Sequence, residues 1–188
     1  MNKAYKEDSL VPSLLILILL CFVFFLINQE TNKYFNYSSS SEGAPALYIK
    51  VYQTTSLVLS TLLPLLLAMF YTITTYLMTI TINYDVSIRN LFRIILTSFS
   101  PVLIVSTLLY LLLAQNFSIS NINKDVMKTE IFNKFTLNDF NIVSNFAWVA
   151  FYVLFIYLLS RQNSSNFFKT LACALTPTII YWIIIAAI

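Results

Sequence analysis

Hydroxyl side chains are the residues of this sequence whose types and spacing could do chemistry. Thr72, Thr75 and Thr79 recur at helical spacing within FYTITTYLMTITIN, so they share one face of a helix. Two interpretations of this face are open. Threonines let membrane helices approach closely and bond across them, for about 0.6 kcal/mol on average. A row of hydroxyls would also suit a path for a neutral substrate.

Other kinds of chemistry are excluded by composition. The chain has no histidine, which excludes a histidine-based triad, an HExxH zinc site and an imidazole proton shuttle. Cys21 and Cys173 lack CxxC spacing, and we expect them to be small apolar groups. Gly43 is the only glycine, which excludes a phosphate-cradling loop and a GxxxG helix seam. We expect a protein that is not an enzyme and has no catalytic residue, metal site or cofactor.

The elements that carry these residues belong in a lipid bilayer. Of 188 residues, 59% are hydrophobic and 10% are charged, whereas about a quarter are charged in soluble domains. Five charge-free stretches approach or exceed the roughly 20 residues that cross a bilayer as a helix: about 10–27, 56–82, 94–114, 142–159 and 170–188. The sequence therefore predicts an all-α, polytopic membrane protein with five transmembrane helices in one domain, 1–188. The lack of carboxylates in these stretches argues against proton-coupled transport.

The first apolar stretch and the positions of the cations predict how the chain is oriented in the membrane. Lys3 and Lys6 precede the first stretch, but the NQETNKYFNY that follows offers no small-x-small cleavage site, which favours a retained signal anchor over a cleaved signal. The short loops expected on the same side of the membrane as the N-terminus concentrate positive charge. This predicts a cytoplasmic N-terminus and an extracytoplasmic C-terminus in the cell membrane. These cations are candidates either for anchors that reach lipid phosphates or for a partner site: Arg89, Arg93, Arg161 and Lys169.

Two longer loops are expected on the other side. Residues 28–50 are polar, and SSSSEGAPA within them is typical of a flexible segment. Residues 115–141 mix apolar and charged side chains without one clean helical stripe. An interfacial helix and a loop folded over the bundle both remain open for this second segment.

An internal repeat organises the chain. NLFRIILTSFSP at 90–101 is matched without a gap by NFFKTLACALTP at 166–177, each with an asparagine, two bulky apolar residues, a cation, an apolar run and a final Ser-Pro or Thr-Pro. The dipeptides Phe70-Tyr71 and Phe151-Tyr152 occupy corresponding places in the preceding helices. This pattern predicts two parallel hairpins, about 56–114 and 142–188, related by an axis along the membrane normal. The first helix stands outside the repeat.

Prolines are expected to bend the helices. Pro101 and Pro177 cannot donate to the carbonyls of Thr97 and Cys173, and Pro64 invites a bend in the second helix. The repeat predicts that Pro101 and Pro177 lie at similar depth. Either the matched bends only let two helices pack around a pseudo-two-fold axis, or they form a hinge that moves in function.

These motifs resemble those of the Yip family, the Ypt/Rab-interacting membrane proteins, and in particular its bacterial branch. The resemblance covers about residues 55–188 and is carried by NYDVSIRNLFRIILTSFSPVLI, LNDFNIVSNFAWVAFYVLFIYLLS and NFFKTLACALTPTII. In bacterial members, a short loop with an "sFr" turn leads to a helix with a central proline, and an "L-D-x-F-x-I-W"-like motif precedes the fourth span. The corresponding positions here are 87–93, Pro101 and 137–143. An abundance of Ile, Asn, Phe and Tyr also suggests an AT-rich bacterial source.

Two classes of function follow from the residues and the resemblance. The resemblance implies a non-enzymatic accessory or scaffold subunit of an ABC-type exporter, for efflux of, or immunity to, antimicrobial peptides or toxins. The alternative is a permease or channel subunit for a neutral or lipid-like substrate, with the threonine face and the proline bends lining and gating a path. We expect membrane lipid and other membrane proteins as partners, either exporter subunits or further copies of this chain, and no nucleic acid.

Overall fold

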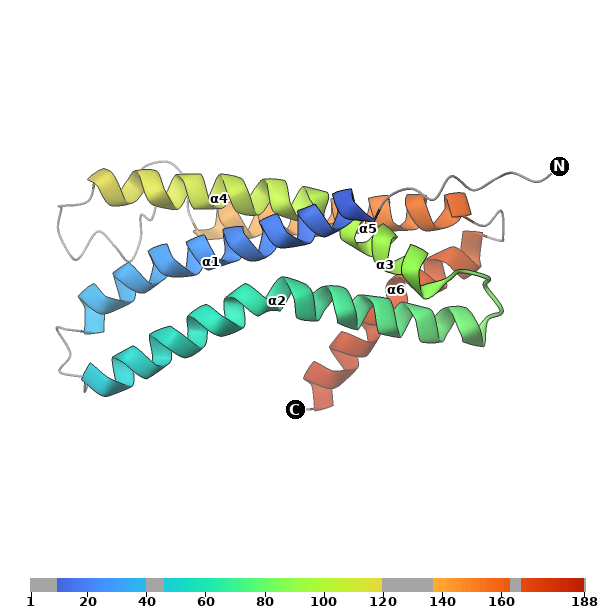
Figure 1. The fold of residues 1–188 in the computed structure, drawn as a ribbon, viewed down its shortest axis with the longest axis horizontal. Helices are drawn as coiled ribbons and strands as arrows, with labels where there is room; N and C mark the ends of the chain where they lie inside the picture. The colour runs from blue at the N-terminus through green and yellow to red at the C-terminus, as the bar shows by residue number, and fades with distance from the viewer. Residues whose placement is uncertain (1–9, 40–45, 120–136, 163–166, 188) are drawn as a thin grey trace.

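The structure is a computed structural model that describes residues 10–39, 46–119, 137–162 and 167–187 (Figure 1). Within these ranges, the regular secondary structure is entirely α-helical. There are six helices in chain order: α1 (Val11–Ser39), α2 (Ala46–Thr81), α3 (Ile88–Ser98), α4 (Ser100–Ile119), α5 (Leu137–Gln162) and α6 (Phe167–Ala187).

The helices have the length and composition of membrane spans. Four apolar stretches are long enough to cross a bilayer: Val11–Asn32, Leu47–Thr81, Ile88–Ala114 and Ile142–Gln162. The apolar stretch of α6, Phe167–Ile183, is shorter. Large apolar side chains lie exposed along the outside of the bundle, which suits a hydrocarbon environment. The predicted all-α, polytopic membrane fold is confirmed.

Four of the five long helices pack around α3 at one end of the bundle. α1 packs against α2, α3 and α4, while α6 packs against α2 and α5, and α5 also packs against α4. α3 contacts α1, α2, α4 and α5, so it is an interior helix. Figure 1 shows the turn between α2 and α3, the end of α5 and the start of α6 at the same end of the molecule. This end is called the α3 end below. The start of α1 lies farther in, where Ser13 meets Thr97 near the end of α3.

The helices extend beyond the predicted apolar boundaries. α1 continues to Ser39 and α2 begins at Ala46, so the expectation of a loop over residues 28–50 was wrong for most of that segment. Polar side chains support the extension, because the Asn28 amide donates to Ser56 Oγ at 2.8 Å and the Asn32 amide donates to Asn28 Oδ1 at 2.8 Å. Similarly, α4 runs to Ile119 and α5 begins at Leu137. The rest of the predicted 115–141 loop lies outside the described residues.

A compact turn reverses the chain between α2 and α3. The Tyr84 N–H donates to the Thr79 carbonyl at 2.8 Å, and the Asn83 N–H donates to the Ile80 carbonyl at 3.3 Å. These two bonds form a Schellman motif, which needs a left-handed residue, and Asn83 supplies it with φ 50°. Ser87 then caps α3 by accepting a bond from the Asn90 N–H at 3.4 Å.

The prolines act differently from one another. The span predicted at 94–114 is interrupted at Phe99, where α3 ends and α4 begins, and Pro101 falls in the first turn of α4, where no backbone donor is required. By contrast, α6 remains one helix through Pro177. Pro64 lies inside α2, which is visibly bent near its middle (Figure 1).

Candidate functional site

Aromatic side chains fill the centre of the bundle where α2, α3 and α5 meet. Phe151 is fully buried, and its ring centre lies 5.3 Å from that of Tyr71 and 4.8 Å from that of Phe99. Trp148 also packs on Phe99, at 6.3 Å between ring centres. Phe99 can reach this position because it stands at the break between α3 and α4. We call Tyr71, Phe99, Phe151 and Tyr152, together with Thr178, the central cluster.

Hydroxyl groups connect three helices within the central cluster. The hydroxyls of Tyr71 and Tyr152 are hydrogen-bonded at 2.5 Å, and the Tyr152 hydroxyl is also bonded to Thr178 Oγ1. This network links α2, α5 and α6. Sequence reasoning identified Tyr71 and Tyr152 as corresponding residues but did not predict their contact.

A second set of bonds holds the α2–α3 turn against α5 and α6. The buried Tyr84 hydroxyl donates to the Leu159 carbonyl at 2.9 Å and lies 3.3 Å from Thr170 Oγ1. Lys169 Nζ donates to the Ile82 carbonyl just beyond the end of α2, at 3.2 Å. Tyr84 was not among the predicted site residues, and only its position after Asn83 in the turn could have indicated it.

The predicted threonine face is buried inside the bundle. Thr72 Oγ1 donates to the Ala68 carbonyl and Thr79 Oγ1 donates to the Tyr76 carbonyl, each at 2.7 Å. Thr75 is also buried, and its hydroxyl has no hydrogen-bond partner in the described part of the chain. Because two of the three hydroxyls bond to their own helix, this arrangement favours helix packing over a row of hydroxyls that offers bonds to a substrate.

The predicted cations gather at the α3 end. Arg89 lies exposed in the first turn of α3, and Arg93 is half-buried one turn later. Arg161 lies in the last turn of α5, with its guanidinium 5.9 Å from the centre of the Tyr157 ring, and exposed Lys169 starts α6. The fold therefore presents a basic surface at one end of the molecule. This surface suits lipid phosphates or an acidic partner.

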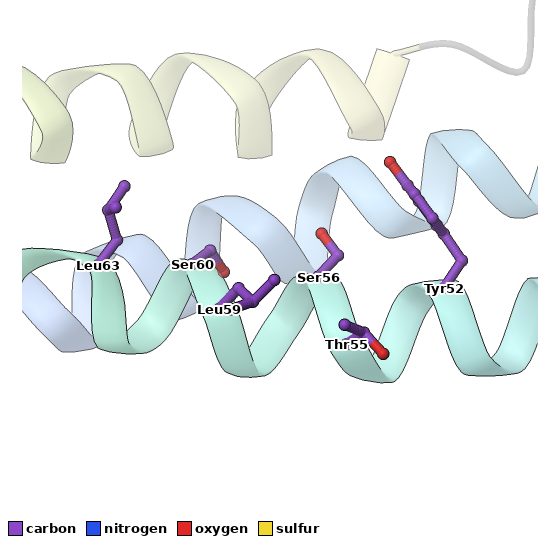
Figure 2. A pocket seen from close by; sticks show the side chains of 6 residues that line it. All are labelled: Tyr52, Thr55, Ser56, Leu59, Ser60 and Leu63. Atoms are coloured by element: carbon purple, nitrogen blue, oxygen red, sulfur yellow. The ribbon is translucent and has the colours of Figure 1, made fainter. Parts of the chain in front are cut away.

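A groove lies along the first half of α2, towards the end opposite to α3. It has a volume of about 400 Å³ and is lined by Tyr52, Thr55, Ser56, Leu59, Ser60 and Leu63. Figure 2 shows Tyr52, Ser56 and Leu63 pointing towards the side on which α4 lies, with α1 behind α2. The groove offers hydroxyl and aliphatic contacts. Sequence reasoning missed it, although Tyr52, Ser56 and Ser60 recur every four residues.

The cysteines and the carboxylates form no reactive centre in the described ranges. Cys21 is half-buried on α1 and Cys173 is buried on α6, and both are free thiols. Among the described residues, no group of three or more His, Cys, Asp or Glu side chains is placed to hold a metal ion.

Comparison of the chain with protein-family models, with curated proteins and with solved structures finds no match. The resemblance to the Yip family therefore stays a prediction.

Proposed function

We propose that this protein is a non-enzymatic, Yip-like accessory or scaffold subunit in the cell membrane, and that its partner is an ABC-type exporter of antimicrobial peptides or toxins. The observation that carries the proposal is the chemistry of the interior. The polar residues buried in the described ranges are serines and threonines, and the buried tyrosines Tyr71 and Tyr84 add two more hydroxyl groups. Such an interior is suited to holding a shape, since ionisable side chains within the membrane are the usual mark of ion pathways and proton relays.

The basic surface supports a partner role at the α3 end. Arg89, Arg161 and Lys169 are exposed there on three different helices, α3, α5 and α6. A rigid bundle that presents several cations together can recognise acidic groups of a membrane partner. The resemblance supplies the class of partner, an ABC-type exporter.

Co-isolation tests this function. We expect the tagged chain, extracted from native membranes in mild detergent, to bring down an ABC-type ATPase or its permease in a fixed ratio. Replacing the three exposed cations by glutamine, as R89Q, R161Q and K169Q together, should weaken this association. Lys50→Gln is the matched control, because Lys50 is an exposed cation on α2 far from the α3 end.

The competing function is a permease or channel subunit for a neutral or lipid-like substrate. Flux of such a substrate through liposomes that contain only this purified chain would contradict the accessory function. Thr75→Val, which removes the unpartnered hydroxyl while conserving shape, should leave co-isolation unchanged if the protein is a scaffold and should reduce flux if the threonine face lines a path.

The proposed orientation places the α3 end in the cytoplasm. After Cys21 and Cys173 are replaced by alanine, a single cysteine is introduced by Arg89→Cys or by Lys50→Cys, both at exposed positions. A membrane-impermeant maleimide should label the Lys50→Cys protein in intact cells. It should label the Arg89→Cys protein only after permeabilisation, and the reverse result would invert the orientation.

A further inference from the structure

α1 covers one side of the bundle, between α2 and α4. It contacts both of these helices and α3. Near one end of this contact Ser13 Oγ lies 3.0 Å from Thr97 Oγ1, and near the other the Asn28 amide donates to Ser56 Oγ. The buried stripe on α1 consists of Ser13, Leu17, Leu20 and Val23. α1 is therefore seated along its length in the space between α2 and α4.

The helices around this space have counterparts on the opposite side. The dipeptide match pairs Tyr71 with Tyr152, and these two hydroxyls touch. Contact between corresponding residues is expected close to a two-fold axis. Such an axis would exchange α2 with α5 and α3–α4 with α6, so the contact of α2 with α6 should correspond to a contact of α5 with α3–α4. Both contacts are present. The counterpart of the α1 position is therefore the space between α5 and the second half of α6.

A buried stripe of α2 can be compared with the corresponding stripe of α5. On α2, which packs against α1, α3 and α6, the stripe contains Ala68 and Thr72. Ala68 is 0% exposed and Thr72 is 5% exposed. Their counterparts 81 residues later, the separation of Tyr71 and Tyr152, are Val149 at 59% and Val153 at 62%. The stripe that is buried on α2 is thus uncovered on α5.

The same difference separates α4 from α6. Leu103, Val105, Ser106 and Thr107 of α4 are half-buried, whereas their counterparts in the proline repeat are all exposed: Ile179, Tyr181, Trp182 and Ile183. Figure 1 shows the reason, since the second half of α6 runs away from α5 while α4 continues beside α1. The two uncovered faces, one on α5 and one on the second half of α6, therefore border the space where these two helices diverge.

We infer that the hairpins α2–α4 and α5–α6 are related by a pseudo-two-fold axis, and that the place corresponding to α1 is filled by one apolar transmembrane helix of a partner protein. The symmetry-related position is filled by a single helix, α1, so the occupant of this space is one helix. Its described walls are apolar, with Phe146, Val149 and Val153 on α5 and Ile179 and Trp182 on α6, so the occupant presents an apolar stripe to them. Because the axis lies along the membrane normal, the occupant runs in the same direction as α1.

This inference deepens the proposed accessory function and rests on it. The test places a benzophenone amino acid at Phe146, Val153 or Trp182 in the full chain in native membranes. Leu77 on α2 and Ile104 on α4 are the matched controls, since their exposure is comparable and they lie outside the walls of this space. The adducts are analysed by mass spectrometry to identify the cross-linked segment.

We expect all three wall positions to cross-link to one apolar membrane-spanning segment of a partner, and both controls to give lipid adducts. Phe146 should react nearer the C-terminal end of that segment and Val153 nearer its N-terminal end, because α5 runs opposite to α1. Adducts between two copies of the chain, lipid adducts alone at the wall positions, or the reverse order would overturn the inference. If the exporter still co-isolates but cross-links only at the controls, this surface is wrong while the accessory function stands. If no partner co-isolates, the function fails as well.

Discussion

The hairpin of α2 and α3–α4 and the hairpin of α5 and α6 share a sequence pattern but differ around their prolines. In the first, the helix breaks at Phe99, whose ring enters the central cluster against Phe151. In the second, the corresponding Leu175 is only half-buried and the helix continues through Pro177. A similar local signal thus gives a break where an aromatic side chain gains a buried position and an intact helix where none is gained.

The largest effect on stability is expected when the ring of Phe151, against which Phe99 packs, is removed. We expect Phe151→Ala to lower the free energy of unfolding by about 3 kcal/mol or more, because it empties a fully buried aromatic site. Denaturant titration of the purified protein in detergent micelles measures this change. Val153→Ala, on the exposed face of α5, should cost far less. Equal losses would show that the central cluster does not hold the two hairpins together.

A smaller effect is expected from the hydroxyls that join the hairpins. Tyr152→Phe removes the bonds to both Tyr71 and Thr178, so we expect a loss of about 1 kcal/mol in the free energy of unfolding. Tyr71→Phe removes one bond and should cost about 0.6 kcal/mol, the average for membrane helices. The double variant should cost no more than the sum of the two, and the same titration measures all three. A larger loss for Tyr71→Phe than for Tyr152→Phe would contradict the network.

The smallest effect concerns the backbone at the two prolines. Pro177→Ala supplies an N–H inside a continuous helix, where the Cys173 carbonyl can accept it, so the new amide should be protected from hydrogen exchange. Pro101→Ala supplies one in the first turn of α4, where it should exchange quickly. Amide exchange followed by mass spectrometry distinguishes the two. Similar protection at both positions would remove the difference between the hairpins.

The helical fold and its apolar spans were predictable from sequence because apolar length is a strong signal, but the described ranges hold six helices where five were predicted, since one span divides at Phe99. The exact ends were not predictable, since polar residues such as Asn28 and Asn32 bond to neighbouring side chains and allow α1 to continue past its apolar stretch. The position of the break at Phe99 also depends on a pocket formed by distant residues. The local sequence shows the proline at 101 but not the distant side chains, Tyr71 and Phe151, that pack against the Phe99 ring.

The candidate site was predictable in part. The gathering of Arg89, Arg161 and Lys169 at one end follows from the spans, because helices that cross in alternation bring their short loops to the same side. The burial of Thr72, Thr75 and Thr79 follows from their shared face. The contact between Tyr71 and Tyr152 does not, because a repeat shows which residues correspond without showing which of them lie near the axis.

The length of α2 has a consequence for the outer surface of the protein. With 36 residues, α2 is roughly 54 Å long at 1.5 Å per residue, well beyond the roughly 30 Å of a hydrocarbon core. α1 accompanies it as far as Ser39. If α2 crosses a bilayer near its normal, the paired ends of α1 and α2 project beyond the hydrocarbon and give antibodies, proteases and inserted tags an accessible target.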